Sequence, residues 1–269
     1  MVMPNCMVWR KLLSILISGY RHTVKLNEFY RSELHYYPGG IIMLKVVILE
    51  IIPELNQEEF NILLPLVTAE KQGRINKYRS FQDARNCLLG DILTRYEICS
   101  HTGLFNNHLT FSSTENGKPC LADRPNIHFN ISHTGNYVAC AISNEPVGVD
   151  IEIIKLISPK IAERFFTQDE IAYIDTTEDV FRFYEVWTKK ESFIKFKGKG
   201  LHMPLSSFSV INSESSLSAN FHKVFQSHVA VGYVCSPMDT PPNVYKIDIY
   251  ELLQNILNSE CFELENHKY

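Results

Sequence analysis

The chain has 269 residues, 45% of them hydrophobic and 21% charged, so it is long enough for one large globular domain or two modest ones. Its net charge of −4 gives no general reason to bind nucleic acid or an anionic membrane, so any phosphate must be held by a local cluster of cations. The seven scattered cysteines never occur in C-x-x-C spacing, which favours reduced thiols in the cytoplasm over a disulfide framework or a zinc site.

Residues 1–42 stand apart from the rest of the sequence. The apolar run at 9–20 is too short to span a bilayer, and no convincing cleavage site follows it. Gly39 and Gly40 lie shortly before Met43, as the translated codons of a ribosome-binding site would. We therefore expect Met43 to be the biological start and residues 1–42 to lie outside the fold, which the glycine codons of the gene would test.

From Met43 onward, strand patterns and helix patterns follow one another. The first part predicts a strand, a mostly helical stretch that ends near Gly103, a hairpin that turns at Asn116–Gly117, and two strands joined by a turn at 134–136. The strand is expected at 45–52, the helical stretch at 53–103, the hairpin at 109–122, and the two further strands at 127–133 and 137–143.

The second part predicts a further strand, three helices, a β-rich stretch and a short C-terminal helix. Ser158 and Pro159 begin the first helix, Thr167 and Glu170 form a capping box for the second, and Gly198 and Gly200 stop the third. The strand is expected at 147–152, the helices at 158–166, 167–174 and 178–201, and the β-rich segments at 208–211, 228–234 and 244–250. This order predicts an α+β fold with two halves, 43–145 and 146–269.

The strand "VGVDIE" carries two carboxylates on one face. Asp150 and Glu152 alternate with valine and isoleucine, about 7 Å apart along the strand, and Gly148 precedes them on the same face. One interpretation is a solvated strand face, since acidic residues are mostly exposed. The other is a cation site, because Mg²⁺ typically takes one or two carboxylates together with substrate phosphates.

The long helix adds a third carboxylate. Glu191 lies on or beside the apolar stripe of this helix, where an unpaired charge is costly. Its simplest partner is Lys195, four residues later, in a helical ion pair worth only a few tenths of a kcal/mol. A metal shared with Asp150 and Glu152 would explain all three carboxylates.

Groups suited to phosphate occur in three other places. Lys71 and Arg74 are one helical turn apart, with Arg79 and Arg85 further along, although most such clusters are solvated charged faces. Lys118 and Pro119 follow the hairpin turn, and Ser132 and His133 end a strand at a glycine turn. Together with Mg²⁺, these groups suit a ligand with several phosphates.

The same segments resemble the Sfp-type 4′-phosphopantetheinyl transferases. The combination of "VGVDIE" with "VWTKKESFIKFKGKGL" about forty residues later is the most specific part of the likeness. The other matching segments are "EKQGRINKYRSFQDARNCLLGD", "FSSTENGKPCL", "HFNISHTGNYVACAI" and "RFFTQDE". The likeness covers the chain from Met43 to the end and weakens after about residue 215.

The resemblance implies a fold, an activity and partners. The fold is a pseudo-two-fold pair of α+β halves with the active site in the cleft between them. The activity is the Mg²⁺-dependent transfer of 4′-phosphopantetheine from coenzyme A to a serine of an apo carrier protein, releasing adenosine 3′,5′-bisphosphate. The carrier would belong to a peptide-antibiotic (nonribosomal peptide), polyketide or fatty-acid synthase, or to lysine synthesis through aminoadipic acid. We expect a cytoplasmic monomer with no nucleic-acid or membrane partner.

Site residues follow from the resemblance position by position. Asp150, Glu152 and Glu191 would bind Mg²⁺, and Lys195 would contact the pyrophosphate and assist the leaving group. The coenzyme A contacts would be Ser132, His133, Lys118 and Pro119 along the channel, with Lys71, Arg74 and Arg85 at the 3′-phosphate. The family's usual arginine falls at Asn86, and Arg85 is one place earlier, which turns the side chain by about 100° around a helix.

The mechanism implied needs no covalent enzyme intermediate. Glu191, directly or through a bound water, would accept the proton of the carrier serine, and Lys195 would stabilise the departing phosphate. Two alternatives are a non-catalytic protein of the same fold that binds coenzyme A or a carrier, and another Mg²⁺-dependent phosphotransfer enzyme such as a nucleotide hydrolase. The absence of G-x-x-x-x-G-K-[ST] excludes a P-loop form of the latter.

Overall fold

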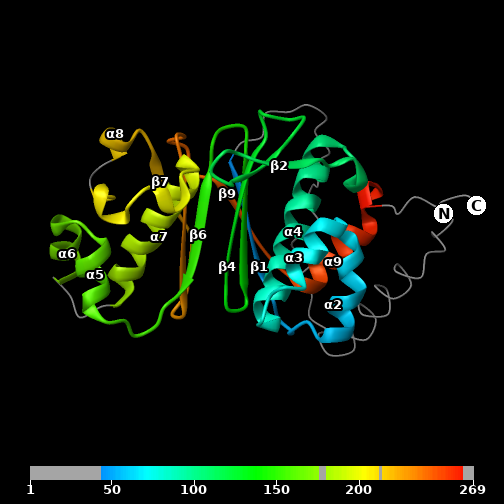
Figure 1. Cartoon of the computed structure of the whole chain (residues 1–269), viewed down its shortest axis with the longest axis horizontal. Coiled ribbons are helices and arrows are strands. Elements are labelled where there is room, and N and C mark those ends of the chain that lie inside the picture. The colour runs from blue at the N-terminus through cyan, green and yellow to red at the C-terminus, as the bar shows by residue number, and fades with distance from the viewer. Residues whose placement is uncertain (1–43, 176–179, 212–213, 263–269) are drawn as a thin grey trace, which may run out of the picture. The chain divides into compact units, whose positions relative to one another are not determined.

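The computed structural model describes residues 44–175, 180–211 and 214–262 (Figure 1). Met43 and the predicted extension at 1–42 lie outside these residues. The described chain forms two compact units, which interleave along the sequence. The first unit comprises residues 49–109 and 247–262, and the second comprises residues 44–48 and 110–246.

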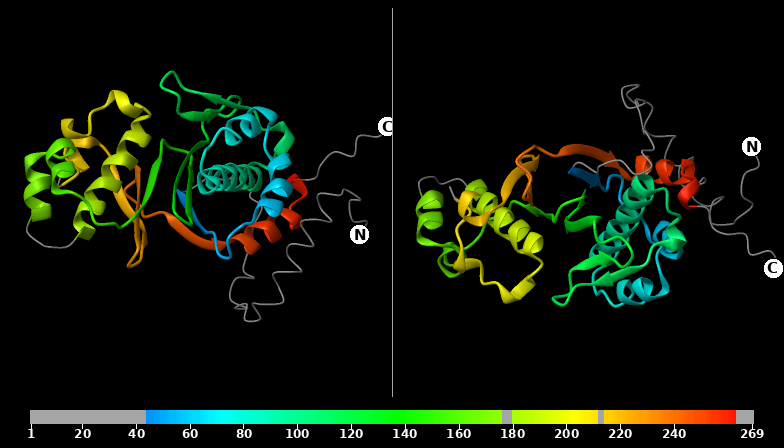
Figure 2. Two further views of the ribbon diagram at one scale, coloured as in Figure 1. Left: turned by 60° about the horizontal axis from the view of Figure 1, so that its bottom comes forward. Right: turned by 90° about the horizontal axis from the view of Figure 1, so that it is seen from above.

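The first unit is mainly helical, as predicted. Its helices are α2 (Gln57–Leu63), α3 (Ala69–Ile75), α4 (Phe81–Thr102) and α9 (Ile249–Asn258). Asn56, Thr68, Ser80 and Asp248 cap their N-termini with side-chain oxygens, and α4 ends at Gly103 with φ 69°. Helix α4 is seen end-on in Figure 2, with α2, α3 and α9 around it.

The second unit contains most of the β structure. A four-stranded sheet has the order β4–β5–β1–β9, a two-stranded sheet pairs β2 with β3, and a three-stranded sheet has the order β6–β8–β7. The strands are β1 (Lys45–Glu50), β2 (Phe111–Ser113), β3 (Pro119–Leu121), β4 (His128–Thr134), β5 (Tyr137–Ser143), β6 (Gly148–Ile153), β7 (Asn220–Gln226), β8 (Ala230–Ser236) and β9 (Asn243–Asp248). The predicted hairpin and the strands on either side of 134–136 are confirmed.

Three helices of this unit were predicted, and all three are confirmed. They are α5 (Pro159–Phe165), which starts after Ser158, α6 (Gln168–Asp175), and α7 (Val180–Lys197), which ends at Gly198 with φ 64°. The described chain also has the short helix α8 (Glu214–Leu217). As the capping box requires, the Thr167 amide donates to the Glu170 carboxylate.

The three-stranded sheet is covered on both faces. Val147, Val149 and Ile151 pack on one face against β1 and β5 residues such as Val46 and Ala141. On the other face, β8 residues pack against helix α7, whose buried Phe193 and Ile194 belong to the same apolar cluster. Strand β6 therefore lies in the interior, with α7 on one side of it and β4 on another (Figure 1).

The predictions for the C-terminal part were wrong in three places. Residues 208–211 form no strand and instead follow the 3₁₀ turn Leu205–Ser207. Strand β7 was not predicted, and its pairing with β8 is interrupted by a bulge at 223–225. The last strand ends at Asp248, because that side chain caps α9.

The segment that follows the Leu205–Ser207 turn is held by a buried ion pair and not by hydrogen bonds to a neighbouring strand. Lys190 and Glu170 are both fully buried, with Lys190 Nζ 2.6 Å from Glu170 Oε2. Lys190 also donates to the Phe208 carbonyl, and Glu170 accepts the Val210 amide at 2.8 Å. These bonds take the backbone groups that a strand would have used.

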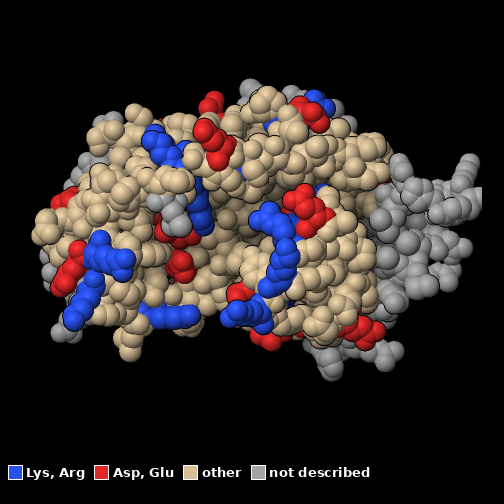
Figure 3. Space-filling model, viewed as in Figure 1, with Lys and Arg blue, Asp and Glu red and all other residues tan. Residues whose placement is uncertain are grey.

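The surface and the thiols agree with the composition. Positive and negative side chains are interspersed on the face shown in Figure 3. Within the described ranges, no helix has the length and apolar content needed to cross a membrane. Cysteines 87, 99, 120, 140, 235 and 261 are all free thiols, as predicted, and Cys6 lies outside the described residues.

Candidate active site

Strands β4 and β6 are joined by side chains of β4. Asn130 Oδ1 accepts the Val149 amide at 2.9 Å, Ser132 Oγ donates to Asp150 Oδ1 at 2.8 Å, and Thr134 Oγ1 lies 3.5 Å from Glu152 Oε2. Alternation in β4 puts these three side chains on one face, so each reaches the next step of β6. The carboxylates of "VGVDIE" are thereby set against a row of polar groups.

Lys195 joins helix α7 to this row. Its Nζ lies 2.7 Å from Asp150 Oδ1, 2.9 Å from Ser132 Oγ and 3.1 Å from the Val149 carbonyl. The simple helical pair with Glu191 is therefore not what is found: Lys195 reaches across to the strand. The three bonds leave its ammonium fully engaged, with 26% of the side chain exposed.

The expectation of an exposed strand face is wrong for Asp150, which is 3% exposed because α7 and β4 both cover β6. Its Oδ1 is bonded to Ser132 and Lys195, whereas its Oδ2 is buried and accepts no hydrogen bond from any described residue. A buried carboxylate oxygen without a partner is costly. A cation at Oδ2 would remove that cost.

The neighbouring carboxylates are poorly neutralised as well. Burial, followed by repulsion from Asp150, raises the pKa of Glu152 to about 7, although Lys195 and a hydrogen bond from Trp187 act against the shift. Burial and then Asp150 likewise raise the pKa of Glu191, with Lys195 opposing. Among the described residues, Glu191 has no hydrogen-bonding or ion-pairing side chain. The site thus carries more negative charge than Lys195 balances.

The donor set fits a hard divalent cation in chemistry but is not gathered around a single point. Carboxylate oxygens are what Mg²⁺ prefers, and the buried Oδ2 of Asp150 and the raised pKa values all favour a bound cation. No cluster of three or more His, Cys, Asp or Glu side chains within the described ranges is positioned to hold a metal ion. In this arrangement Lys195 stands beside Asp150 as the neutralising charge.

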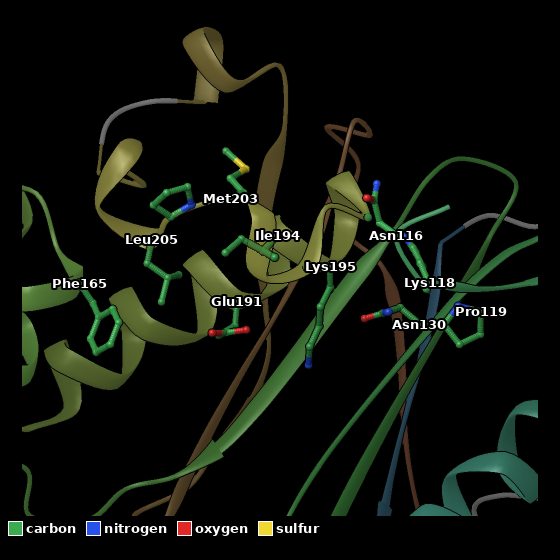
Figure 4. Close-up of a pocket in the computed structure, with 14 residues that line it drawn as sticks. Asn116, Lys118, Pro119, Asn130, Phe165, Glu191, Ile194, Lys195, Met203 and Leu205 are labelled. Atoms are coloured by element: carbon green, nitrogen blue, oxygen red, sulfur yellow. The ribbon is translucent and has the colours of Figure 1, made fainter. Parts of the chain in front are cut away.

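A cavity of about 440 Å³ opens beside the cluster (Figure 4). Glu191 and Lys195 line it from α7, and Asn130 faces it from β4. One part of its wall is apolar and is formed by Phe165, Ile194, Met203, Pro204 and Leu205. The opposite part is formed by the hairpin residues Asn116, Gly117, Lys118 and Pro119.

Lys118 and Pro119 both line this cavity. The Lys118 ammonium, however, is turned to backbone carbonyls, donating to Val147 at 2.8 Å and to Phe196 at 3.4 Å. Burial lowers the pKa of Lys118 to about 8. Its first role is thus to tie the hairpin to β6 and α7.

The side chains of His133 and Ser132 point to opposite faces of β4, because neighbouring residues alternate along a strand. His133 is exposed and lies on the face opposite the Ser132–Asp150 contact. The structure therefore brings Ser132, and not His133, into the cluster with Asp150 and Lys195.

Lys71, Arg74 and Arg85 belong to the first unit. Lys71 pairs with Asp91 at 3.3 Å, and Arg74 is exposed near the end of α3. Arg85 is 3% exposed and donates from Nε and Nη2 to Asn86 Oδ1, 3.2 Å each. Burial lowers the pKa of Arg85, with Glu54 opposing.

Three contributors were not singled out from the sequence as site residues. Asn130 and Thr134 bond β6 from the same face of β4 as Ser132, and Trp187 bonds Glu152 from α7. A period-two signal was available, because Asn130, Ser132 and Thr134 are polar residues at alternate positions of "FNISHT". Trp187 packs against the apolar cluster around α7, so no sequence signal marks its contact with Glu152.

The chain is similar to known proteins over most of its length. Residues 54–145 match the family model "4′-phosphopantetheinyl transferase, N-terminal", and residues 146–236 match "4′-phosphopantetheinyl transferase superfamily". The 4′-phosphopantetheinyl transferase Sfp of Bacillus subtilis is 39% identical over 215 residues, covering 74% of this chain and 95% of the relative. The transferase gsp of Aneurinibacillus migulanus is 34% identical over 238 residues, covering 83% and 100%. The human L-aminoadipate-semialdehyde dehydrogenase-phosphopantetheinyl transferase is 31% identical over 168 residues, covering 56% and 54%.

Proposed function

Since the chain belongs to the 4′-phosphopantetheinyl transferase family and is of the Sfp type, it transfers the phosphopantetheine of coenzyme A to a carrier protein, and we propose that the cluster of Asp150, Glu152, Glu191 and Lys195 is where the transfer takes place. The acceptor is the serine hydroxyl of an apo carrier, and adenosine 3′,5′-bisphosphate leaves. The observation that carries the proposal is the contact of Lys195 with Asp150 and Ser132, beside a buried carboxylate oxygen that has no partner among the described residues.

The family uses a divalent metal ion, and we assign Mg²⁺ to Asp150, Glu152 and Glu191. The raised pKa values of Glu152 and Glu191 support the assignment, as does Asp150 Oδ2, which no residue in the described ranges bonds. A cation would lower both pKa values and give that oxygen a partner. When bound, Mg²⁺ supplies charge neutralisation for the pyrophosphate.

Glu191 and Lys195 then have separate roles in the transfer. Glu191 faces the cavity and forms no ion pair with any described residue, so its carboxylate takes the proton of the carrier serine as the serine oxygen attacks the phosphorus attached to pantetheine. The bond from that phosphorus to the bridging oxygen of the departing portion breaks. Lys195, at the edge of the same cavity, stabilises the charge on the leaving phosphate.

Two sets of residues are proposed to contact coenzyme A. Ser132, Lys118 and Pro119 stand in or beside the cavity, and His133 is placed with them by resemblance alone. Lys71, Arg74 and Arg85 are proposed for the 3′-phosphate. The exposed Arg74 and the partly exposed Lys71 have side chains accessible to such a group, whereas Arg85 is buried against Asn86.

The carrier would be a domain of a peptide, polyketide or fatty-acid synthase, or of an enzyme of lysine synthesis through aminoadipic acid. Two relatives named L-aminoadipate-semialdehyde dehydrogenase-phosphopantetheinyl transferase support the last of these. The two family models meet at 145–146, which supports a chain built of halves 43–145 and 146–269. We further propose a cytoplasmic monomer that uses neither nucleic acid nor a membrane.

Product mass tests the function. The full chain is incubated with an apo carrier, coenzyme A and Mg²⁺, with Glu191→Gln as the matched inactive variant. We expect the carrier to gain one phosphopantetheine and adenosine 3′,5′-bisphosphate to appear in equal amount. A carrier of unchanged mass with bound coenzyme A would indicate a binding protein, and coenzyme A split without carrier modification would indicate a hydrolase.

A further inference from the structure

Helix α7 lies against strand β6 at Gly148 with no room for a side chain. A Cβ at this position would be 2.0 Å from the Ser192 carbonyl oxygen and 2.3 Å from the Phe196 amide nitrogen. Both are backbone atoms, which cannot rotate away as the end of a side chain can. The helix and the strand are therefore as close as their backbones permit.

The two contact points are the immediate neighbours of the proposed functional residues. Ser192 follows Glu191, and Phe196 follows Lys195, whereas Asp150 is two residues beyond Gly148 on the same face of β6. The approach at Gly148 thus sets how far Glu191 and Lys195 stand from the strand. At this spacing, Lys195 Nζ is 2.7 Å from Asp150 Oδ1.

Lys118, from the hairpin, bonds both elements at the contact between β6 and α7. Its Nζ bridges the carbonyls of Val147, just before Gly148, and Phe196, just after Lys195, at 2.8 and 3.4 Å. The Cδ of Lys118 would also lie 3.2 Å from a Cβ at Gly198, the residue that ends α7. One cation from the hairpin thereby fixes both elements at the point where their backbones touch.

We propose that Gly148 and Lys118 are positioning residues that set the distance between Asp150 on β6 and Lys195 on α7. This inference rests on the proposed function and adds that the spacing, and not only the identity of the groups, determines the rate. Gly148→Ala must widen the contact between its Cβ and the Ser192 carbonyl oxygen from 2.0 Å to the 3.4 Å at which ordinary contact begins. A misplacement of that size costs on the order of a hundredfold in rate.

The test is a double-mutant cycle on kcat with a structural readout. Gly148→Ala and Lys118→Met are each measured in the wild type and in Lys195→Met, with KM for coenzyme A and the melting temperature recorded. Val186→Ala is the control, because Val186 is buried in α7 and its truncation lowers stability without pushing the helix from β6. A crystal structure of Gly148→Ala measures the distance from Lys195 Nζ to Asp150 Oδ1.

If the inference holds, each positioning variant lowers kcat at least tenfold with KM changed less than threefold, and loses less than threefold in the Lys195→Met protein. The distance exceeds hydrogen-bonding range, and Val186→Ala changes only the melting temperature. Wild-type kcat in Gly148→Ala, or equal losses in both backgrounds, would overturn it. If Gly148→Ala does not fold, Lys118→Met decides by the same cycle, and a loss confined to KM would make Lys118 a ligand contact only. Wild-type turnover in Lys195→Met would instead overturn the site itself.

Discussion

Lys195 forms its ion pair with Asp150 on strand β6, across the boundary between helix and strand, at 2.7 Å from Nζ to Oδ1. Glu191, four residues earlier in the same helix, is left facing the cavity. In a helical pair, Lys195 would neutralise Glu191. Here Lys195 is bonded to the strand instead, so the two residues can have separate roles. The lysine is held next to the strand carboxylate, and the glutamate stays available to accept a proton.

Asp150→Asn should lower kcat by about two to three orders of magnitude, the range for loss of a major electrostatic stabiliser. The amide keeps the size of the carboxylate but removes its charge toward Lys195 and toward a cation at Oδ2. Because Asp150 is buried, the melting temperature should also fall, unlike that of a change on an exposed strand face. Steady-state kinetics at saturating Mg²⁺ measure this loss of kcat. Near-wild-type turnover of the variant would contradict the prediction.

Glu191→Gln should fold, bind coenzyme A with Mg²⁺, and transfer at least about a hundredfold more slowly, the low end for loss of a general base. The matched control is Glu185→Gln in the same helix, since Glu185 pairs with Lys189 at 2.9 Å and does not line the cavity. Calorimetry gives the binding and product mass gives the rate. Equal rates for the two variants would place the base elsewhere.

Lys71→Ala combined with Arg74→Ala should raise KM for coenzyme A far more than KM for dephospho-coenzyme A, which lacks the 3′-phosphate. Each charge-assisted contact is worth about 1.5–3 kcal/mol. Lys77→Ala, an exposed change just after α3, is the control and should affect neither substrate. Equal weakening toward both substrates would mean that this pair of cations serves another purpose.

Much of this architecture could be predicted from local patterns. Alternation in "VGVDIE" and "FNISHT", the Asn116–Gly117 turn, and the end of α7 at Gly198 are all decided by residues near in sequence. Helix α7 could therefore be drawn with Glu191 near its buried side. Local patterns explain the elements, because turn chemistry and hydrophobic period act within a few residues.

The remaining features depend on contacts between distant residues. No pattern in α7 shows that Lys195 meets a residue 45 positions earlier, or that Lys118 bonds Phe196, 78 positions later. The segment after Leu205 appeared strand-like because Phe208 and Val210 are apolar. Its backbone is instead bonded to the buried Lys190–Glu170 pair.

Glu170→Ala should reduce the free energy of unfolding by about 3–5 kcal/mol, because it leaves the fully buried Lys190 ammonium without its counter-charge. Lys189→Ala breaks a partly exposed helical pair one residue away and should cost under about 1 kcal/mol. Urea unfolding compares the two variants. Similar losses would show that the buried pair is no more stabilising than a surface one.

The raised pKa of Glu152 makes the stability of the metal-free protein depend on pH. Burial and Asp150 raise the pKa of Glu152 from an ordinary 4.5 to about 7, with Glu191 adding to the shift and Lys195 and Trp187 opposing it. Between these values the folded protein binds more protons than the unfolded chain, so this group makes the metal-free protein less stable as the pH rises from about 4.5 to 7. Above that range the penalty is fully present.

Glu152→Gln removes the titrating charge, so the metal-free variant should gain roughly 1–3 kcal/mol over the wild type between pH 5 and pH 8. Melting curves in EDTA at the two pH values measure this gain. Adding Mg²⁺ at pH 8 should stabilise the wild type more than the variant, because the cation neutralises the carboxylate that glutamine lacks. If the difference between the two proteins is the same at pH 5 and pH 8, Glu152 titrates like a solvent-exposed glutamate. The charge of Glu152 would then give no support to a cation site.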